Sequence, residues 1–309
     1  MDKLVLVMAA GESKRMRSDI PKALHRICGK PILWYVLDTV GKVCDTVIPI
    51  LGHGRERIAR EVGIREYAMQ DFSTGKGTGH AVMCASHYLE GKTGQVIVTA
   101  GDMPLISEES YSALREAVAS GASAALLYAE LDNPFNYGRV IMDEDGRVQC
   151  IVEEKDCTEE QKRIRESNAS VYCFDIDALK WALPRIHNHN AANEYYLTDC
   201  VEILAEAGYD VAAVPMRDAS EFKGINTRAQ LDEAARVMRH RINTAHMLAG
   251  VTMVDSLNTY IDIGVTIGRD TIIYPGVVIE GDTVIGENCV ILPACHLVNA
   301  NISDNSTCR

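Results

Sequence analysis

Several features are scarce in this sequence of 309 residues, and each scarcity excludes a class of protein. Basic residues number 31 against 43 acidic ones, and the net charge of −12 argues against nucleic acid or an anionic membrane as a main partner. No apolar run approaches the roughly 20 residues of a membrane span. The apolar start Leu4–Ala10 is too short for a secretory signal and predicts a buried first strand, so we expect a cytoplasmic protein.

Paired cysteines are also missing. The ten cysteines contain no C-x-x-C pattern and are scattered through apolar stretches, which favours reduced, buried thiols over a disulfide or zinc framework. His187 and His189 form the only histidine pair at short spacing, and without further ligands nearby they do not predict a metal site. The apolar fraction of 47% and the charged fraction of 24% are typical of a globular chain, and the length suits two domains.

Up to about residue 225, short apolar segments alternate with helical ones. The predicted strands are Leu4–Met8, Thr46–Leu51, Ile64–Met69 and Val96–Ala100, and the predicted helices are Pro31–Val40, Arg55–Val62 and Thr78–Leu89. This alternation predicts an α/β, Rossmann-like domain with a mainly parallel sheet that is covered on both faces. A hairpin over 139–152 and a helix over 230–247 follow. Ligands bind such sheets beyond the carboxyl ends of the strands, so the loops after the first and fourth strands are candidate site loops.

A different pattern begins after Gly250. Large aliphatic residues recur at a spacing of six, and small or β-branched residues precede most of them by two positions. The recurring positions are Ile261, Ile267, Ile273, Ile279, Ile285, Ile291 and Leu297. No helix has this period, and it predicts a short parallel β-helix of about two and a half coils.

The loop after the first strand carries small residues and two cations. Ala9, Ala10 and Gly11 let backbone N–H groups approach a phosphate or a base, and Arg15 and Lys22 add positive charge. These residues suit a triphosphate, and they equally suit a tight turn with two solvated bases. The glycine-rich segment 75–79 leaves a similar choice between a nucleotide contact and a flexible loop.

The fourth strand ends in Gly101 and Asp102. A carboxylate at the carboxyl end of a strand suits Mg²⁺, which takes oxygen ligands and usually bridges the protein to substrate phosphates. The alternative is that Asp102 caps the helix that begins near Ser107, but this does not explain the neighbouring glycine. The sequence therefore favours a metal role for Asp102.

Together these motifs resemble the bacterial bifunctional UDP-N-acetylglucosamine pyrophosphorylase/glucosamine-1-phosphate N-acetyltransferase family. The matching segments are 9–11 with 15–16, 21–25 and 29–31, then 77–81, 101–105, 133–139, 151–156, 193–199, 224–228 and 258–261. The resemblance implies a nucleotidyltransferase domain over 1–228, a linker helix over 229–250 and a partial left-handed β-helix over 251–309. It therefore extends over nearly the whole sequence.

The resemblance also implies a role for each matching site residue. It implies catalytic roles for Arg15 and Lys22, and Mg²⁺ binding by Asp102 and Asn226, of which Asn226 is also a substrate contact. The sugar pocket is implied at Gly138, Glu153 and Asn168. The implied nucleotide contacts are Met8, Ala9, Ala10, Gly11, Lys22, Gln70, Gly77, Thr78 and Gly101. The implied substrates are UTP and N-acetylglucosamine 1-phosphate, and the product UDP-N-acetylglucosamine serves cell-wall peptidoglycan synthesis. A homotrimer through the β-helix is implied too, and the short repeat leaves the oligomeric state open.

Three departures from the family pattern limit these expectations. Ala100 stands where an aromatic residue is common, and the loop 70–77 is about two residues longer than usual, so another sugar or nucleotide remains an alternative. A non-catalytic remnant is a third hypothesis, which the presence of Arg15, Lys22, Asp102 and Asn226 opposes. The family's acetyltransferase half lies on later coils, so we expect no acetyl transfer from these 309 residues.

Overall fold

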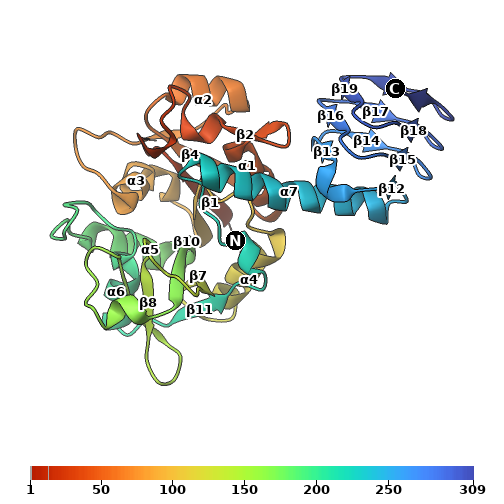
Figure 1. Cartoon of the computed structure of the whole chain (residues 1–309). Helices are drawn as coiled ribbons and strands as arrows, with labels where there is room; N and C mark the ends of the chain where they lie inside the picture. Colours follow the sequence, from red (N-terminus) through yellow and green to blue (C-terminus); the bar gives the residue numbers. More distant parts are fainter. Residues whose placement is uncertain (1, 13) are drawn as a thin grey trace. The chain divides into compact units, whose positions relative to one another are not determined.

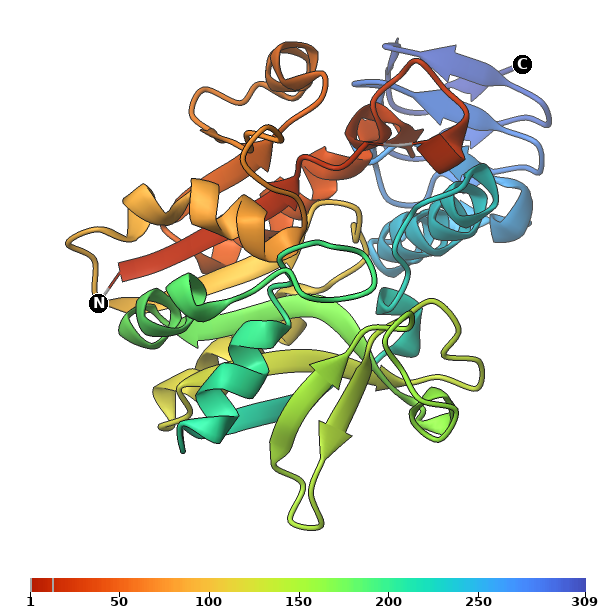
Figure 2. The ribbon, with the colours of Figure 1, turned by 90° about the vertical axis from the view of Figure 1, so that its left-hand side faces the viewer.

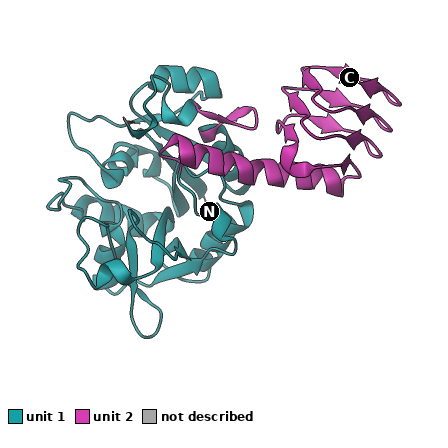
Figure 3. Cartoon of the chain, in the orientation of Figure 1, with its two compact units in different colours: residues 1–24, 33–224 teal, residues 25–32, 225–309 magenta. Residues whose placement is uncertain are grey.

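The computed structural model describes residues 2–12 and 14–309, so Met1 and Ser13 of the predicted first domain lie outside the described residues. The chain divides into two compact units, residues 1–24 with 33–224 and residues 25–32 with 225–309 (Figure 3). The domain boundaries expected at 228 and 250 stay predictions. Among the described helices, none is long and apolar enough to cross a lipid bilayer.

The first unit is built on one mixed sheet (Figure 1). In sheet order its main path is β11 (Val211–Pro215), β7 (Ala124–Glu130), β10 (Glu166–Asp175), β6 (Gly94–Ala100), β1 (Asp2–Ala9), β4 (Thr46–Leu51) and β5 (Ala68–Met69). Strand β10 is antiparallel to both neighbours, and the other pairs along the path are parallel. The predicted mainly parallel sheet is confirmed.

The predicted hairpin is confirmed as well. Strands β8 (Arg139–Met142) and β9 (Val148–Val152) pair in antiparallel fashion, and β8 also bonds to β10. Figure 2 shows this hairpin, in yellow-green, extending away from the main sheet. Its base lies at Gly138, so the hairpin places residues 138 and 153 beside each other at the sheet.

Helices cover both faces of the sheet because the central strands are apolar on both sides. In β1, Leu4 and Leu6 face one core, and Val5 and Val7 face the other. The first core includes residues of α3 (Thr78–Cys84), α5 (Ile176–Ala182) and α6 (Asp199–Glu206); the second includes residues of α1 (Ile32–Val43), α2 (Arg55–Val62) and α4 (Glu108–Ala119). The alternating burial holds the strands in register and fixes where each one ends.

Two predicted elements were wrong in extent. The segment Ile64–Met69 forms a strand only over its last two residues, because Ile64 donates its N–H to the oxygen of Ala59 and finishes the cap of α2. The predicted helix Thr78–Leu89 is divided into α3 and the 3-10 helix η3 (Ser86–Leu89) at Ala85. Both errors arise from apolar residues that pack at a turn.

The main segment of the second unit, residues 225–309, contains α7 (Arg228–Leu248) and then a parallel β-helix. Thr227 and Gln230 form a capping box that starts the helix. The strands that follow are β12 (Thr252–Met253), β13 (Tyr260–Ile261), β14 (Thr266–Ile267), β15 (Ile272–Ile273), β16 (Val278–Glu280), β17 (Val284–Ile285), β18 (Val290–Ile291), β19 (His296–Val298), β20 (Asn301–Ile302) and β21 (Thr307–Cys308). They form three parallel ladders, one on each side of the coil.

The six-residue pattern predicted this core. Ile273, Ile279 and Ile291 are completely buried, and so are the smaller residues at the positions two before them, among them Val277 and Cys289. Leu297 in the last coil is half-buried. The repeat therefore builds its interior from one aliphatic and one small residue on each side.

A short hairpin from the N-terminal part of the sequence belongs to the second unit. Strands β2 (Arg26–Ile27) and β3 (Lys30–Pro31) flank a turn in which Gly29 has φ +87°. A Cβ atom on Gly29 would lie 2.6 Å from the carboxyl group of Asp262, and the N–H of Ile263 donates to the oxygen of Cys28 at 3.1 Å. Glycine is required here by both the backbone conformation and the close contact.

Candidate active site

The loops after β1 and β6 meet where these two parallel strands end. Met8 pairs with Ala100, and one step further the N–H of Gly101 donates to the oxygen of Met8 at 2.9 Å. A Cβ atom on Gly101 would lie 2.9 Å from the Cβ of Ala9, so only glycine permits this approach. The structure thus brings the predicted nucleotide residues Met8 and Ala9 against the predicted substrate residue Gly101.

A lysine and an aspartate join the two loops. The Nζ of Lys22 lies 2.5 Å from the Oδ2 of Asp102, and the side chains are 20% and 22% exposed. Lys22 opens the 3-10 helix η2 (Lys22–Leu24), whose other two residues are buried and anchor it. Arg15 is exposed in η1 (Lys14–Met16), next to the buried Met16. The predicted cation and the predicted metal ligand are therefore direct neighbours.

The capping alternative for Asp102 does not hold. The Oγ of Ser107 accepts the N–H of Ser110 at 3.2 Å and is the N-cap of α4. Asp102 lies before this cap, at the end of β6, where its carboxylate is partly exposed beside Lys22. Its position is set by the strand end and Gly101.

The carboxylate of Asp102 is a suitable ligand for Mg²⁺. A carboxylate is a hard oxygen ligand, and Mg²⁺ commonly takes one or two carboxylates together with substrate phosphates and water. No cluster of three or more histidine, cysteine, aspartate or glutamate residues suited to a metal occurs in the described ranges 2–12 and 14–309. Asp102 fits as one ligand of an ion that a triphosphate helps to hold.

Gln70, Gly77 and Thr78 lie on a second part of the site. The Nε2 of Gln70 donates to the oxygen of Gly77 at 3.1 Å, and the hydroxyl of Thr78 accepts the N–H of Leu197 at 2.9 Å. Gly77 has φ +103°, and a Cβ atom there would lie 2.3 Å from the oxygen of Tyr195. This segment is therefore a closely packed turn, and the fold itself requires glycine at position 77.

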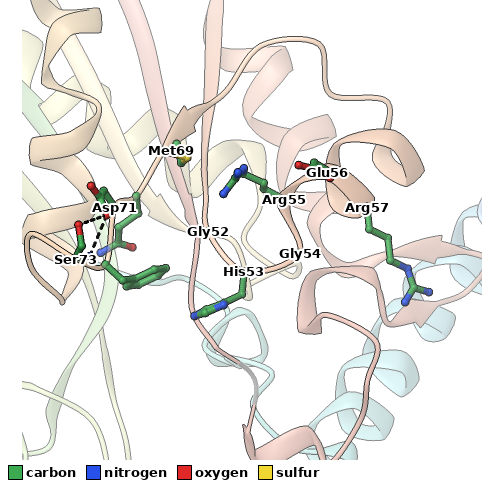
Figure 4. Close-up of a pocket in the computed structure, with 11 residues that line it drawn as sticks. Gly52, His53, Gly54, Arg55, Glu56, Arg57, Met69, Asp71 and Ser73 are labelled. Atoms are coloured by element: carbon green, nitrogen blue, oxygen red, sulfur yellow. Dashed lines mark hydrogen bonds between the residues drawn. The ribbon is translucent and has the colours of Figure 1, made fainter.

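A pocket of about 540 Å³ lies beside this turn, lined by residues 52–57 and 69–73 (Figure 4). Gly52 connects it to the loop after β1, since a Cβ atom on Gly52 would lie 2.7 Å from the oxygen of Ala10. The rings of His53 and Phe72 stack with their centroids 5.0 Å apart. Gln70 lines the pocket, which places a predicted base contact next to the predicted nucleotide loop.

Gly138, Glu153 and Asn168 meet at the base of the β8–β9 hairpin. A Cβ atom on Gly138 would lie 3.5 Å from the Oε2 of Glu153 and 3.6 Å from the Cβ of Asn168. Asn168 is buried, and its Nδ2 donates to the hydroxyl of Tyr172 at 2.7 Å while its Oδ1 accepts the N–H of Ser170 at 3.1 Å. Asn168 therefore shapes this place with a fixed side chain.

Carboxylates surround this third part of the site. Burial raises the pKa of Glu153, and the charge of Asp156 raises it further. Burial and then Glu202 raise the pKa of Asp199 to about 7. Carboxylates accept hydrogen bonds from hydroxyl groups, so this part suits a neutral polyol, whereas Lys22 suits a phosphate.

Asn226 belongs to the second unit, so the metal pair expected from the sequence is divided between the two units. Its backbone N–H donates to the Oε1 of Gln230 at 2.9 Å, which ties it to the first turn of α7. The roles assigned to all these residues stay predictions. What the structure adds is three groups within the first unit, around Lys22, Gln70 and Glu153.

Two features of the site escaped the sequence analysis. His80 is buried and contacts both Gln70 and Thr74. Arg139 is 2% exposed and forms an ion pair of 2.7 Å with Glu154, next to Glu153. Both residues lie inside segments that carried the family resemblance, and that was the only signal for them.

Comparisons with known proteins agree with this architecture. The model of the MobA-like NTP transferase domain matches residues 5–166, and the bacterial transferase hexapeptide model, of six repeats, matches residues 264–297. A structure from Bacillus anthracis, described as a glucose-1-phosphate thymidylyltransferase in complex with a sucrose, has a TM-score of 0.60 at 16% identity and covers 75% of this chain and 94% of its own. Sheet, loops and repeat thus define a nucleotidyltransferase domain followed by a hexapeptide β-helix.

The relatives define the family. The bifunctional protein GlmU of Clostridium kluyveri is 46% identical over 311 residues, which cover 99% of this chain and 68% of the relative. The bifunctional protein GlmU of Geobacillus thermodenitrificans is 44% identical over 310 residues, covering 99% of this chain and 67% of the relative. The chain belongs to the GlmU family and spans about two thirds of the length of these relatives.

Proposed function

We propose that this chain is a Mg²⁺-dependent uridylyltransferase that forms UDP-N-acetylglucosamine and pyrophosphate from UTP and N-acetylglucosamine 1-phosphate. The observation that carries the proposal is the contact of 2.5 Å between Lys22 and Asp102 at the joined ends of β1 and β6. A cation and a hard-oxygen ligand at one point are what a triphosphate with its metal needs. The membership in the GlmU family supplies the substrates.

The proposed reaction needs no covalent enzyme intermediate. A phosphate oxygen of the sugar phosphate attacks the α-phosphorus of UTP, a new P–O bond forms, and the bond to the β-phosphate oxygen breaks to release pyrophosphate. Two anions have to approach each other, so the protein's main tasks are to position them and to offset their repulsion. Mg²⁺, when bound through Asp102, supplies positive charge at the phosphates.

The chain's own residues divide these tasks. Lys22 and Arg15 place positive charge at the loop after β1, and the small residues 9–11 leave room for a phosphate beside the backbone. Glu153 and the fixed Asn168 supply the polar wall for the sugar. The pocket beside Gln70 supplies the place for the base. This arrangement supports a base, a phosphate and a sugar subsite in one unit.

A pyrophosphate-release assay tests the proposal. The purified chain should turn over UTP with N-acetylglucosamine 1-phosphate in the presence of Mg²⁺, and Asp102→Asn should lower the rate on the order of a hundredfold to a thousandfold. Glu116→Gln, at an exposed position of α4, is the matched control and should keep the wild-type rate. A wild-type chain without turnover, or Asp102→Asn with the full rate, would refute the proposed function.

Another nucleotide or sugar is the second candidate. The longer loop 70–77 is folded around His80 and lines the pocket, so the feature that differs from the family lies at the predicted base subsite. Competition among several nucleotides and sugar phosphates in one assay separates the two candidates. If UTP and N-acetylglucosamine 1-phosphate are not the preferred pair, the specificity is different and the chemistry is retained.

The non-catalytic remnant remains testable by calorimetry. Absence of Mg²⁺-dependent UTP binding by the purified chain would favour it. The expected homotrimer, the cytoplasmic location and the expected lack of acetyl transfer all stay predictions.

A further inference from the structure

His80, on the first core face of the sheet, has a different close polar partner at each ring nitrogen, and the Sγ of Cys84 lies farther off, at 3.9 Å from Nδ1 and 3.8 Å from Nε2. The Nδ1 lies 3.2 Å from the Nε2 of Gln70, and the Nε2 lies 3.0 Å from the Oγ1 of Thr74. The side chain is 6% exposed, and its ring packs closely on Gly75. These contacts determine which nitrogen carries the proton.

The assignment starts from Thr74. The hydroxyl of Thr74 has one proton and gives it to the oxygen of Asp71 at 2.9 Å, so it can only accept from the ring, and Nε2 must be protonated. In the neutral ring Nδ1 is then unprotonated and can accept a hydrogen bond from Gln70. Burial supports the neutral ring by lowering the pKa of His80, although the charge of Asp71 acts in the opposite direction.

This tautomer fixes the direction of the Gln70 carboxamide. Its Nε2 has two protons, one for the oxygen of Gly77 at 3.1 Å and one for the Nδ1 of His80 at 3.2 Å. A carboxamide turned by 180° would bring its oxygen against two acceptors, so this orientation is excluded. The Oε1 of Gln70 is therefore the remaining polar atom, and within the described part of the chain it accepts no hydrogen bond.

We infer that His80 is a positioning residue, which turns the acceptor of Gln70 to the pocket and so selects a nucleobase that presents a ring N–H. The inference rests on the proposed function and names what its base subsite recognises. Uracil offers a donor at N3, whereas cytosine has an acceptor at N3. A buried acceptor without a donor is costly, so CTP should be rejected.

Two substitutions at one position separate positioning from packing. In His80→Asn the Oδ1 lies at about the place of Nδ1 and keeps an acceptor for Gln70, and in His80→Gln the longer side chain reaches toward Thr74 and leaves Gln70 without its acceptor. We expect His80→Asn to keep the preference for UTP over CTP, measured as the ratio of kcat/KM. His80→Gln should lower this ratio on the order of tenfold to a hundredfold, chiefly through KM for UTP. His87→Gln, at an exposed histidine of η3, is the control.

The outcomes distinguish this inference from the proposed function. Thermal melting of each variant checks that it folds. If the wild type turns over UTP but the two His80 variants have the same ratio, the positioning role is refuted and the uridylyltransferase stands. If the wild type shows no turnover, the proposed function fails, and ¹⁵N NMR of the imidazole still tests the geometry. A protonated Nε2 with a bare Nδ1 supports the inference, and a proton on Nδ1 overturns it.

Discussion

The two units of this chain use their strands in different ways. In the first unit the central strands are largely buried, and several candidate site residues come directly after a strand, as Gly101 and Asp102 come after β6. In the β-helix of the second unit the middle strands supply a buried aliphatic residue, such as Ile279 in β16, beside a more exposed one such as Val278. The predicted site residues lie mostly in the first unit, whereas the β-helix over 251–309 carries none of them. Substitutions should therefore lower rate in the first unit and stability in the second.

The largest effect should come from the interior of the β-helix. Ile279 is completely buried, so Ile279→Ala should lower the free energy of unfolding of the second unit by about 2–5 kcal/mol. Turnover should stay near wild type at temperatures where the unit is folded. Urea unfolding followed by circular dichroism measures the loss, and Val284→Ala, at a position 45% exposed, is the control. A loss of turnover as large as that of a site variant would contradict the expectation that substitutions in the second unit lower stability and not the rate.

For Lys22, at the joined ends of β1 and β6, we expect a loss of turnover with little loss of stability. Lys22→Met should lower transition-state stabilisation by about 2.7–4 kcal/mol, on the order of a hundredfold to a thousandfold in turnover. Its melting temperature should change little because the side chain is partly exposed. The matched control is Lys92→Met, since Lys92 forms a more exposed ion pair with Asp2 at 3.2 Å. Equal rates in the two variants would contradict a role for Lys22 in the reaction.

A smaller effect tests whether the carboxylates of the proposed sugar subsite lower the stability of the folded chain. The pKa of Asp199 is raised from 3.8 to about 7, so between these values the folded state holds a proton that the unfolded state has lost, and stability falls as pH rises through this range. The free energy of unfolding of Asp199→Asn should exceed that of the wild type by about 1–2 kcal/mol above pH 7, and this difference should disappear at acidic pH. Urea unfolding at several pH values measures it. Asp177→Asn, in the first turn of α5 and 68% exposed, is the control and should change the free energy of unfolding by less than about 1 kcal/mol.

The smallest effect should come from the surface of the β-helix. The Nε2 of His296 lies 2.6 Å from the Oε2 of Glu280 on the neighbouring coil, and the side chains are 57% and 47% exposed. Glu280→Gln should change the free energy of unfolding by less than about 1 kcal/mol. Thermal melts at low and high salt measure it. A larger loss would contradict the expectation that the stability of this unit comes mainly from its buried residues.

The fold could largely be predicted because its signals are local. Continuous apolar strands, a capped helix and a six-residue period all lie within a few neighbouring positions, and the parallel sheet and the β-helix follow from them. The strand expected over Ile64–Met69 was wrong because an apolar residue after a helix cap has the same pattern as a strand residue. A pattern of hydrophobicity does not tell which surface an apolar side chain packs against.

The candidate site was predictable only in part. Gly101 and Asp102 follow an apolar strand, which is a local signal, and the structure places them against the loop after β1. The tautomer of His80 depends on Gln70 and Thr74 from a loop that folds back on α3, and no spacing rule gives that geometry. The ion pair of Arg139 links the start of β8 to Glu154, which follows β9, and its burial shows only once the hairpin is packed. Local patterns locate the loops, and the packing of distant segments decides what their side chains do.

The hairpin of residues 25–32 limits how this protein can be recombined with its relatives. It is encoded within the first unit's part of the sequence, yet its turn at Gly29 is fitted to Asp262 and Ile263 of the β-helix. A chimera that replaces residues 225–309 by the corresponding part of a relative would leave the hairpin facing a foreign coil. An exchange of the second unit therefore has to move two separate stretches of the sequence together.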